Sequence, residues 1–390
     1  MKKQELAECE TENRVPESPG DPEVSGTPEA VDKGVDYMCI AAALRDEIRA
    51  GVYGSSDPFP SLTKIMRRFG VSRPSAVRSI SELKRMGLVV VRKGAGTFVS
   101  NKNRKIGLAI PGTADSEFFS AIMDGIVINC SSWGSDLVAG DMFPMDPSLR
   151  ATQAERLARH FVATRVAGVI MQPVGFAENA DAVNRTISTI LREAQIPVVL
   201  VDYDIAKPPA RSMYDLVAID NFGAGRKIAA HLLSAGAKRI CCLLRSLCAE
   251  SVHTRFSGID CEVSRAQRGR HIDIFVAEPD DEKAISAAIK KYKPDAIVCP
   301  NDIAAAKLEL TLATLGIHVP KDVMVAGFDD VCIASTANPP LTTIRQPCRE
   351  IANMAFKTLL ERMNNPDLPP REILLDTSLI VRESTVRTEK

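Results

Sequence analysis

The chain has 390 residues, with 49 basic and 49 acidic side chains and a formal net charge of zero at pH 7. This length is enough for two or three domains with buried cores, and the balanced charge excludes a whole-protein attraction to a polyanion. No apolar run reaches membrane-spanning length, no positively charged start leads into an apolar signal region, and the ten cysteines show no metal-like spacing, so we expect a reduced, cytoplasmic protein.

The first segment, residues 1–36, is strongly acidic. It carries ten acidic and four basic side chains, four prolines and hardly any large apolar residue. Such a segment cannot bury enough apolar surface to offset the entropy that it would lose on ordering. We therefore expect a disordered acidic tail.

Three short helices are predicted in the 37–87 region. The first, over 37–50, has apolar residues spaced i, i+4, i+8 along one face. Ser61 and Ser72 are placed to cap the second and third helices, which a glycine turn separates. The side chains expected to face inward are Ile40, Leu44, Ile48, Ile65, Met66, Phe69, Val77, Ile80 and Leu83.

Two short strands are predicted next, over 88–92 and 97–99, around the glycine-rich turn Lys93-Gly94-Ala95-Gly96. Glycines at the tip of such a hairpin let the backbone come close to a DNA groove. Residues 61–105 carry twelve Lys and Arg against one acid, Glu82, and a local basic block of this kind indicates a phosphate-binding module. The alternative is a solvated charged face. The pattern predicts a winged helix-turn-helix.

In a helix-turn-helix the last helix enters the major groove, where its first turn meets base edges and phosphates. The guanidinium of Arg73 has the geometry to bind a guanine edge or to clamp a phosphate, and the sequence leaves both roles open. The candidate DNA-binding residues are Ser61, Lys64, Ser72, Arg73, Ser75, Arg78, Arg92, Lys93, Gly94, Gly96 and Thr97.

Residues 37–100 resemble the winged helix-turn-helix of the GntR family of bacterial transcription regulators. The chain departs from the family pattern at Leu62-Thr63, where the family often has Glu-Arg, and at Val77, where arginine is common. A family-standard operator is therefore not expected. The motifs that carry the resemblance are Pro60-Ser61, Val71-Ser72-Arg73, Leu83, Gly87-Leu88 and Gly94-x-Gly96-Thr97-Phe98-Val99.

After a linker over 101–105, apolar strand-like runs alternate with amphipathic helices through 106–388. Continuous apolar strands between helices indicate parallel sheets covered on both faces. Because the strands are too many for one sheet and the run breaks near Pro208-Pro209, we expect an α/β fold of two doubly wound lobes with a ligand cleft between them. The strands are expected over 106–110, 166–171, 196–202, 216–220, 239–244, 272–276, 295–299 and 323–327.

This large region resembles the effector-binding domain of the LacI/GalR regulators, which is related to periplasmic sugar-binding proteins. The combination of this domain with a GntR-type DNA-binding domain resembles the arabinose-repressor type of sugar regulator. The resemblance implies a periplasmic-binding-protein-like domain that dimerises and binds a small effector. Among the motifs that carry it are Asp220-Asn221-x-x-x-Gly225, Arg255-x-x-Gly258, Gly327-Phe328-Asp329-Asp330 and the segment from Pro339 to Pro347.

A sugar site needs side chains that make paired hydrogen bonds, and aromatic rings that cover apolar ligand faces. By their positions in the family motifs, Arg255 and Asp302 are expected to contact the effector; the alternatives are a structural ion pair for Arg255 and a helix N-cap for Asp302. Of Phe118 and Phe119, one is expected to stack on the ligand, and we prefer Phe118. The remaining effector-binding candidates are Gln172, Tyr203 and Asn301.

Three acidic positions are expected to have structural roles. Asp329 and Asp330 are expected to brace the hinge between the lobes, and Asp220-Asn221 to form a turn and a helix cap. The five histidines are scattered, and neither a phosphate-loop spacing nor a catalytic or metal-binding grouping is present, so we expect neither an enzyme nor a cofactor.

We therefore predict a sequence-specific transcriptional repressor that acts as a homodimer on a palindromic operator and is switched by a small effector, a sugar, bound between the lobes. Two alternatives remain at this point. One is an orphan regulator whose large domain only dimerises. The other is a soluble sugar-binding protein with no transcriptional role.

Overall fold

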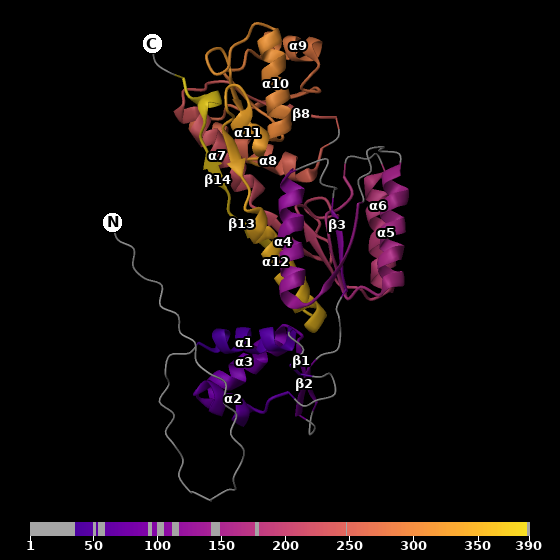
Figure 1. Ribbon diagram of the computed structural model, residues 1–390. Coiled ribbons are helices and arrows are strands. Elements are labelled where there is room, and N and C mark those ends of the chain that lie inside the picture. Colours follow the sequence, from indigo (N-terminus) through magenta and orange to yellow (C-terminus); the bar gives the residue numbers. More distant parts are fainter. Residues whose placement is uncertain are drawn as a thin grey trace, which may run out of the picture.

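The computed structural model describes residues 36–49, 52–53, 59–92, 96–99, 105–110, 117–141, 149–175, 179–246 and 248–387. Apart from Asp36, the predicted acidic tail lies outside the described residues. The described chain forms a small helical head and two α/β lobes (Figure 1). Within the described ranges, no helix combines the length and the apolar character that a membrane span requires.

The head confirms the three predicted helices and the wing. Its core contains Ile40, Leu44, Ile65 and Leu83, all fully buried in one cluster. Gly70 makes the turn between the second and third helices with φ 63°, a conformation that favours glycine. The elements are α1 (Tyr37–Arg49), α2 (Leu62–Phe69), α3 (Arg73–Arg85) and the antiparallel strands β1 (Val89–Arg92) and β2 (Gly96–Val99).

Two expectations about α3 are wrong. Val77 does not face the core: its side chain is 41% exposed, because the buried stripe of α3 runs through Ala76 and Leu83, and the next residue points about 100° further around the helix. Ser72 does occupy the N-cap position, but its side chain makes no capping hydrogen bond. Its Oγ instead lies 3.2 Å from Oγ of Ser75.

Lobe 1 contains a six-stranded parallel sheet in the order β13-β7-β6-β5-β3-β4. Helices α4 (Glu117–Trp133) and α12 (Cys348–Asn364) cover one face, and α5 (Arg150–Thr164) and α6 (Ala180–Glu193) cover the other. The strands are β3 (Lys105–Ile110), β4 (Asp136–Asp141), β5 (Gly168–Met171), β6 (Val198–Val201), β7 (Asp215–Ile219) and β13 (Glu372–Leu375).

Lobe 2 contains a four-stranded parallel sheet in the order β11-β10-β8-β9. Helices α7 and α8 pack on one face, and α9 and α10 on the other. The elements are α7 (Asn221–Ser234), β8 (Ile240–Leu244), α8 (Glu250–Ala266), β9 (Asp273–Val276), α9 (Glu282–Tyr292), β10 (Ala296–Val298), α10 (Asp302–Thr314), β11 (Met324–Ala326) and the short α11 (Cys332–Thr336). All eight predicted strands of the large domain are present, with ends within two residues of the expected ones.

Two glycines let α7 and α8 approach closely. A Cβ atom on Gly225 would lie 2.0 Å from the carbonyl oxygen of Arg255, and one on Gly258 would lie 2.1 Å from that of Phe222. Any side chain at either position would therefore push the two helices apart. This contact gives the Arg255-x-x-Gly258 motif a structural reason for its glycine.

The chain passes from lobe 1 to lobe 2 at Asp220, and the expected break near Pro208-Pro209 is wrong. That loop joins β6 to β7, which pair side by side in the sheet of lobe 1. The chain returns to lobe 1 through β12 (Thr343–Arg345) and α12. Strand β14 (Ser378–Ile380) then pairs antiparallel with β12 at the hinge.

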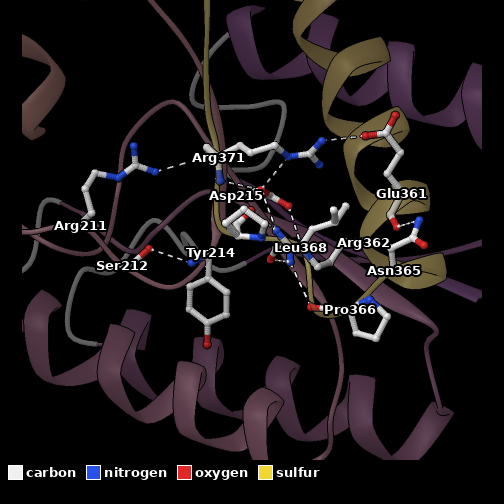
Figure 2. A network of polar contacts seen from close by, with 11 residues as sticks. Arg211, Ser212, Tyr214, Asp215, Glu361, Arg362, Asn365, Pro366, Leu368 and Arg371 are labelled. Carbon is white, nitrogen blue, oxygen red and sulfur yellow. Dashed lines mark hydrogen bonds and ion pairs between the residues drawn. The ribbon is translucent and has the colours of Figure 1, made fainter.

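A buried ion-pair network lies at the end of lobe 1 that is remote from lobe 2 (Figure 2). Asp215 is fully buried and accepts hydrogen bonds from Nε and Nη2 of Arg362, each at 3.0 Å, and from the backbone N–H of Arg371 at 2.8 Å. Arg371 also binds Glu361 at 2.8 Å. Burial alone would raise the pKa of Asp215, but the hydrogen bonds from the two arginines outweigh it and lower that pKa.

We expect Asp215→Ala to lower the free energy of unfolding by about 3 kcal/mol, because it leaves two arginines without their shared carboxylate. Urea denaturation measures this loss. The matched control is Asp181→Ala, which breaks the exposed pair between Asp181 and Lys207 and should cost less than about 1 kcal/mol. Equal losses in the two variants would contradict the prediction.

Candidate functional site

The exposed side of α3 is the candidate DNA-binding face of the head. Arg73, Val77 and Arg78 are exposed there, and Arg73 and Val77 lie one helical turn apart. Ser72 and Ser75 are half-buried at the start of the helix, where the first backbone N–H groups have no intrahelical partner and can bind phosphate.

The other predicted DNA-binding residues surround this helix. Ser61 caps α2, since its Oγ accepts a hydrogen bond from the backbone N–H of Lys64 at 3.3 Å, and the side chain of Lys64 is exposed. In the wing, Gly96 has φ 107°, and the carbonyl oxygen of Thr97 accepts a hydrogen bond from the N–H of Phe59 at 2.7 Å. The side chain of Arg92 and the whole of Lys93 and Gly94 lie outside the described residues.

Four polar side chains meet where the two lobes face each other: Gln172, Asp202, Arg255 and Asp329, here called the interlobe cluster. Gln172 follows β5, Asp202 follows β6, and Asp329 comes three residues after β11, so three of the four lie just beyond the carboxyl ends of parallel strands. Ligands of open α/β sheets bind at these ends. Opposite charges attract Arg255 to both aspartates.

Arg255, on α8, is the buried centre of this cluster. It is only 4% exposed; its Nε donates to Oδ1 of Asn221 at 3.1 Å, and its Nη1 donates to the carbonyl oxygen of Pro300 at 2.7 Å. The guanidinium carbon lies 3.4 Å from the centre of the Phe328 ring. Burial lowers the pKa of Arg255 while the nearby aspartates raise it, and an arginine remains charged at neutral pH.

Asp202 and Gln172 connect the lobes and present a free acceptor. Asp202 accepts a hydrogen bond from Nε2 of Gln172 at 2.8 Å, and the guanidinium of Arg255 in lobe 2 attracts its carboxylate. Among the described residues, Oε1 of Gln172 has no hydrogen-bond partner although it is buried. Leaving such an acceptor unpaired costs about 1–3 kcal/mol. A ligand hydroxyl is a suitable donor for it.

Backbone strain marks the two aspartates. Asp202 has φ 75° and Asp329 has φ 106°, in the left-handed region that non-glycine residues rarely adopt. Conformations of this kind cluster at ligand sites. Burial raises the pKa of Asp329 to about 7, against the opposing effect of Arg255, so this carboxyl group can donate or accept hydrogen bonds near neutral pH.

The structural roles predicted for Asp329, Asp330 and Asp220-Asn221 are found in part. Asp330 forms ion pairs with Arg345 and Arg382, each at 2.6 Å, and so braces the hinge. Asp329 accepts from Nε2 of Gln346 at 2.7 Å, but it also faces Arg255, which the sequence reasoning missed. Asp220 caps α7 as predicted, and Asn221 in addition holds Arg255.

Asp302 is not the N-cap of α10. Asn301 is the N-cap of α10, accepting from the N–H of Ala304 at 2.8 Å. Asp302 is fully buried, and its oxygens accept from the hydroxyl of Thr343 at 2.6 Å and the N–H of Val331 at 3.0 Å. It therefore ties α10 to the hinge strand β12, with both of its oxygens bound by protein groups.

Two aromatic candidates also change role. Phe118 is 6% exposed and belongs to the core of lobe 1, so the preference for it as a stacking ring is corrected. Phe119 is half-buried, with its ring centre 4.8 Å from that of Phe118, and is the more accessible of the two. The hydroxyl of Tyr203 donates to the carbonyl oxygen of Pro173 at 2.9 Å, which joins two loops that follow neighbouring strands.

Two family models match the chain. Residues 37–99 match the gntR family of bacterial regulatory proteins, and residues 229–385 match the periplasmic binding protein-like domain. The chain is a transcription regulator that joins these two domains. The predicted fold class, with a winged helix-turn-helix and a two-lobed α/β domain, is confirmed.

Curated relatives of this regulator are transcriptional repressors. The HTH-type transcriptional repressor PurR of Vibrio atlanticus (strain LGP32) is 28% identical over 297 residues, covering 74% of this chain and 83% of the relative. PurR of Haemophilus influenzae is 26% identical over 292 residues, which cover 73% of this chain and 82% of the relative.

Solved structures show the same architecture. A transcription regulator GntR from Chromobacterium violaceum is 26% identical with a TM-score of 0.58, covering 72% of this chain and 99% of that one. The transcriptional regulator CelR in complex with cellobiose has a TM-score of 0.62 at 22% identity. The match covers 88% of this chain and 98% of CelR. At 22% identity, the similarity to CelR shows the fold alone.

The buried carboxyl group of Asp302 predicts how stability depends on pH. Burial, reinforced by the nearby Asp329, raises its pKa from 3.8 to about 8. Between these values the folded chain holds a proton that the unfolded chain has released, so the free energy of unfolding falls as pH rises from about 4 to about 8. Asp302→Asn, which mimics the protonated form, should make this fall shallower.

Urea denaturation at pH 5, 7 and 8.5 measures this slope. The matched control is Asp181→Asn at an exposed position, which should keep the slope of the unchanged chain. An unchanged slope in Asp302→Asn would show that Asp302 is already ionised throughout this range.

Proposed function

We propose that this regulator is a repressor whose operator affinity is switched by a neutral sugar bound at the interlobe cluster. The observation that carries the proposal is Arg255, buried between two strained aspartates, beside a glutamine with an unpaired acceptor. A fixed guanidinium, two carboxyl groups and an amide oxygen supply both donors and acceptors to adjacent hydroxyl groups.

The charges of the cluster favour a neutral ligand over an anionic one. One guanidinium faces two carboxyl groups, so the cluster offers no surplus positive charge to a phosphate or a carboxylate. The half-buried Phe119, near the start of α4, is the aromatic side chain that we propose covers an apolar ligand face. The ligands named for related structures, cellobiose, ribose and D-xylulofuranose, are neutral sugars and support this choice.

We propose binding rather than catalysis, because protein partners hold Arg255 and both aspartates of the cluster in fixed orientations. The working form is a C2-symmetric homodimer in the bacterial cytoplasm, whose two heads meet a palindromic operator in successive major grooves. A sugar that bridges the lobes would change their angle and therefore the spacing of the heads. Such coupling is typically worth about 5–150-fold in affinity.

A thermal-shift panel tests the sugar site. Ribose, glucose, cellobiose, sugar phosphates and purines are each added to the purified chain, and a neutral sugar is expected to stabilise it, by about 2.7 kcal/mol at a hundredfold excess over Kd. Arg255→Ala and Asp329→Asn should lose this shift. Arg245→Ala, in the exposed pair with Glu278 of the same lobe, is the control that should keep it. A blank panel would favour a regulator without an effector.

The operator contact of α3 is tested with Arg73→Ala. This change should weaken binding to an operator duplex, selected from a random-sequence library, by about 5–150-fold, the range for one lost bidentate contact. Sugar stabilisation should be unchanged. Arg67→Ala, at an exposed position of α2, is the matched control. An identical DNase footprint in Arg73→Ala would remove Arg73 from the recognition role.

Val77 is proposed to read a thymine methyl group. It is an exposed β-branched side chain on the DNA-binding face, one turn after Arg73, and the thymine methyl is the apolar group of the major groove. Replacing the contacted thymine by uracil should weaken binding about fourfold per half-site, as expected for one buried methyl group. Val77→Ala should bind both duplexes equally. Equal binding of both by the unchanged chain would contradict this contact.

A further inference from the structure

The C-terminal part of α3 lies against lobe 1. Helix α3 contacts α12, and Trp133, the last residue of α4, packs against the core of the head as well as that of lobe 1. The guanidinium carbon of Arg85 lies 5.9 Å from the centre of the Trp133 ring. Figure 1 shows the C-terminal end of α12 pointing toward the head.

Charges on the two sides of this contact are complementary. On α3, Arg85 donates to Glu82 at 2.8 and 2.5 Å, which fixes the orientation of its guanidinium. Across the contact, Lys357 of α12 attracts Glu82, and Glu361 of α12 attracts Arg85. Each helix therefore carries one acidic and one basic side chain at the contact, and each of these is attracted by a side chain of opposite charge on the other helix.

The lobe 1 side of the contact is held rigidly. We call Trp133, Lys357 and Glu361 the docking platform. Glu361 is bound by Arg371, which is tied in turn to the buried Asp215 (Figure 2). The ring of Trp133 lies 6.0 Å from that of Phe356 on α12.

Helices α4 and α12 run from this platform to the hinge. Glu117, at the start of α4, accepts a hydrogen bond from the N–H of Cys332 in lobe 2 at 2.6 Å, and α12 starts two residues after Gln346, which holds Asp329. The two helices pack so closely that a Cβ on Gly125 would lie 2.5 Å from Cβ of Ala352. A closely packed pair moves as one body.

We propose that the docking platform is the surface on which the chain's own head is seated, and that Arg85 and Trp133 are positioning residues that pass a change of lobe angle to α3. This transmission rests on the proposed function, whereas the docking itself does not. Arg73, Val77 and Arg78 lie nearer the other end of α3, so docking leaves the DNA-binding face open. The platform therefore orients the head without blocking it.

The joint leaves room for the head to tilt. A groove of about 490 Å³ separates part of the head from α12, lined by Lys84, Arg85, Val90 and Val91 on one side and by Glu361 and Asn365 on the other. Because the head rests on a few contacts beside this groove, a rotation of α12 can shift α3 without unfolding either part.

Trp133 is the single tryptophan of the chain, so its fluorescence reports docking without any ligand. Arg85→Glu on the head and Lys357→Glu on α12 each place like charges across the contact, and each should raise the acrylamide quenching constant of Trp133 about twofold. Arg67→Glu, a charge reversal at an exposed position of α2, is the matched control and should leave it unchanged. Circular dichroism confirms that the variants are folded. Equal quenching in all four proteins would overturn the docking.

The transmission is tested with the selected operator duplex and the sugar that stabilises the chain in the panel. The sugar should change operator Kd about 5–150-fold in the unchanged chain and less than about twofold in Arg85→Glu. In Arg85→Glu the sugar-induced thermal shift should be the same as in the unchanged chain. The operator Kd measured without sugar should stay within about threefold of that of the unchanged chain. A variant that keeps the full response, or loses sugar-free binding, would overturn the positioning role of Arg85. If no sugar binds, the proposed function fails and the fluorescence measurement still decides the docking.

Discussion

The relation between the two lobes depends on one buried cation. Arg255 is withdrawn from water in lobe 2, and desolvation of such an ion costs several kcal/mol unless charges and hydrogen bonds compensate for it. The compensation comes from Asn221 at the point of crossing, from Asp202 in lobe 1 and from Asp329 at the hinge. Any change in the angle between the lobes therefore changes the electrostatic environment of Arg255, and a ligand that binds it acts on that angle.

The polar partners of the aspartates between the lobes divide them into two kinds. Asp302 and Asp330 have their oxygens bound to hinge atoms and hold the joint between the lobes. Asp202 and Asp329 face Arg255. The first kind holds the lobes together, and the second kind belongs to the proposed sugar site.

Lobe 1 lies between the interlobe cluster and the head. At one end its strands finish at the interlobe cluster, and at the other the network around Asp215 fixes Glu361 and the end of α12. Helices α4 and α12 run along the sheet between these two ends. In the proposed transmission, this rigid helix pair couples the two sites through its own orientation, without a flexible relay.

The sequence by itself determined the class of the chain and most of its elements, but it did not predict β4, α8, α11, β12, α12, β13 or β14. Hydrophobic periodicity, caps and glycines are local, so the helices of the head, the wing and the eight apolar strands were predicted with ends close to the observed ones. The family motifs likewise identified both domains, which the comparisons confirm. The position of Arg255 in the cleft followed from its motif.

Only the tertiary structure decided which side chains share the cleft and which way they face. Asp302 and Asp329 both follow the end of a strand. Because β12 lies beside α10, Asp302 is buried against Thr343, whereas Asp329 faces Arg255. Phe118 and Phe119, or Ala76 and Val77, differ only by their rotation about a helix whose packing partner is distant in the sequence. Such distinctions depend on contacts between remote segments, and no local pattern encodes them.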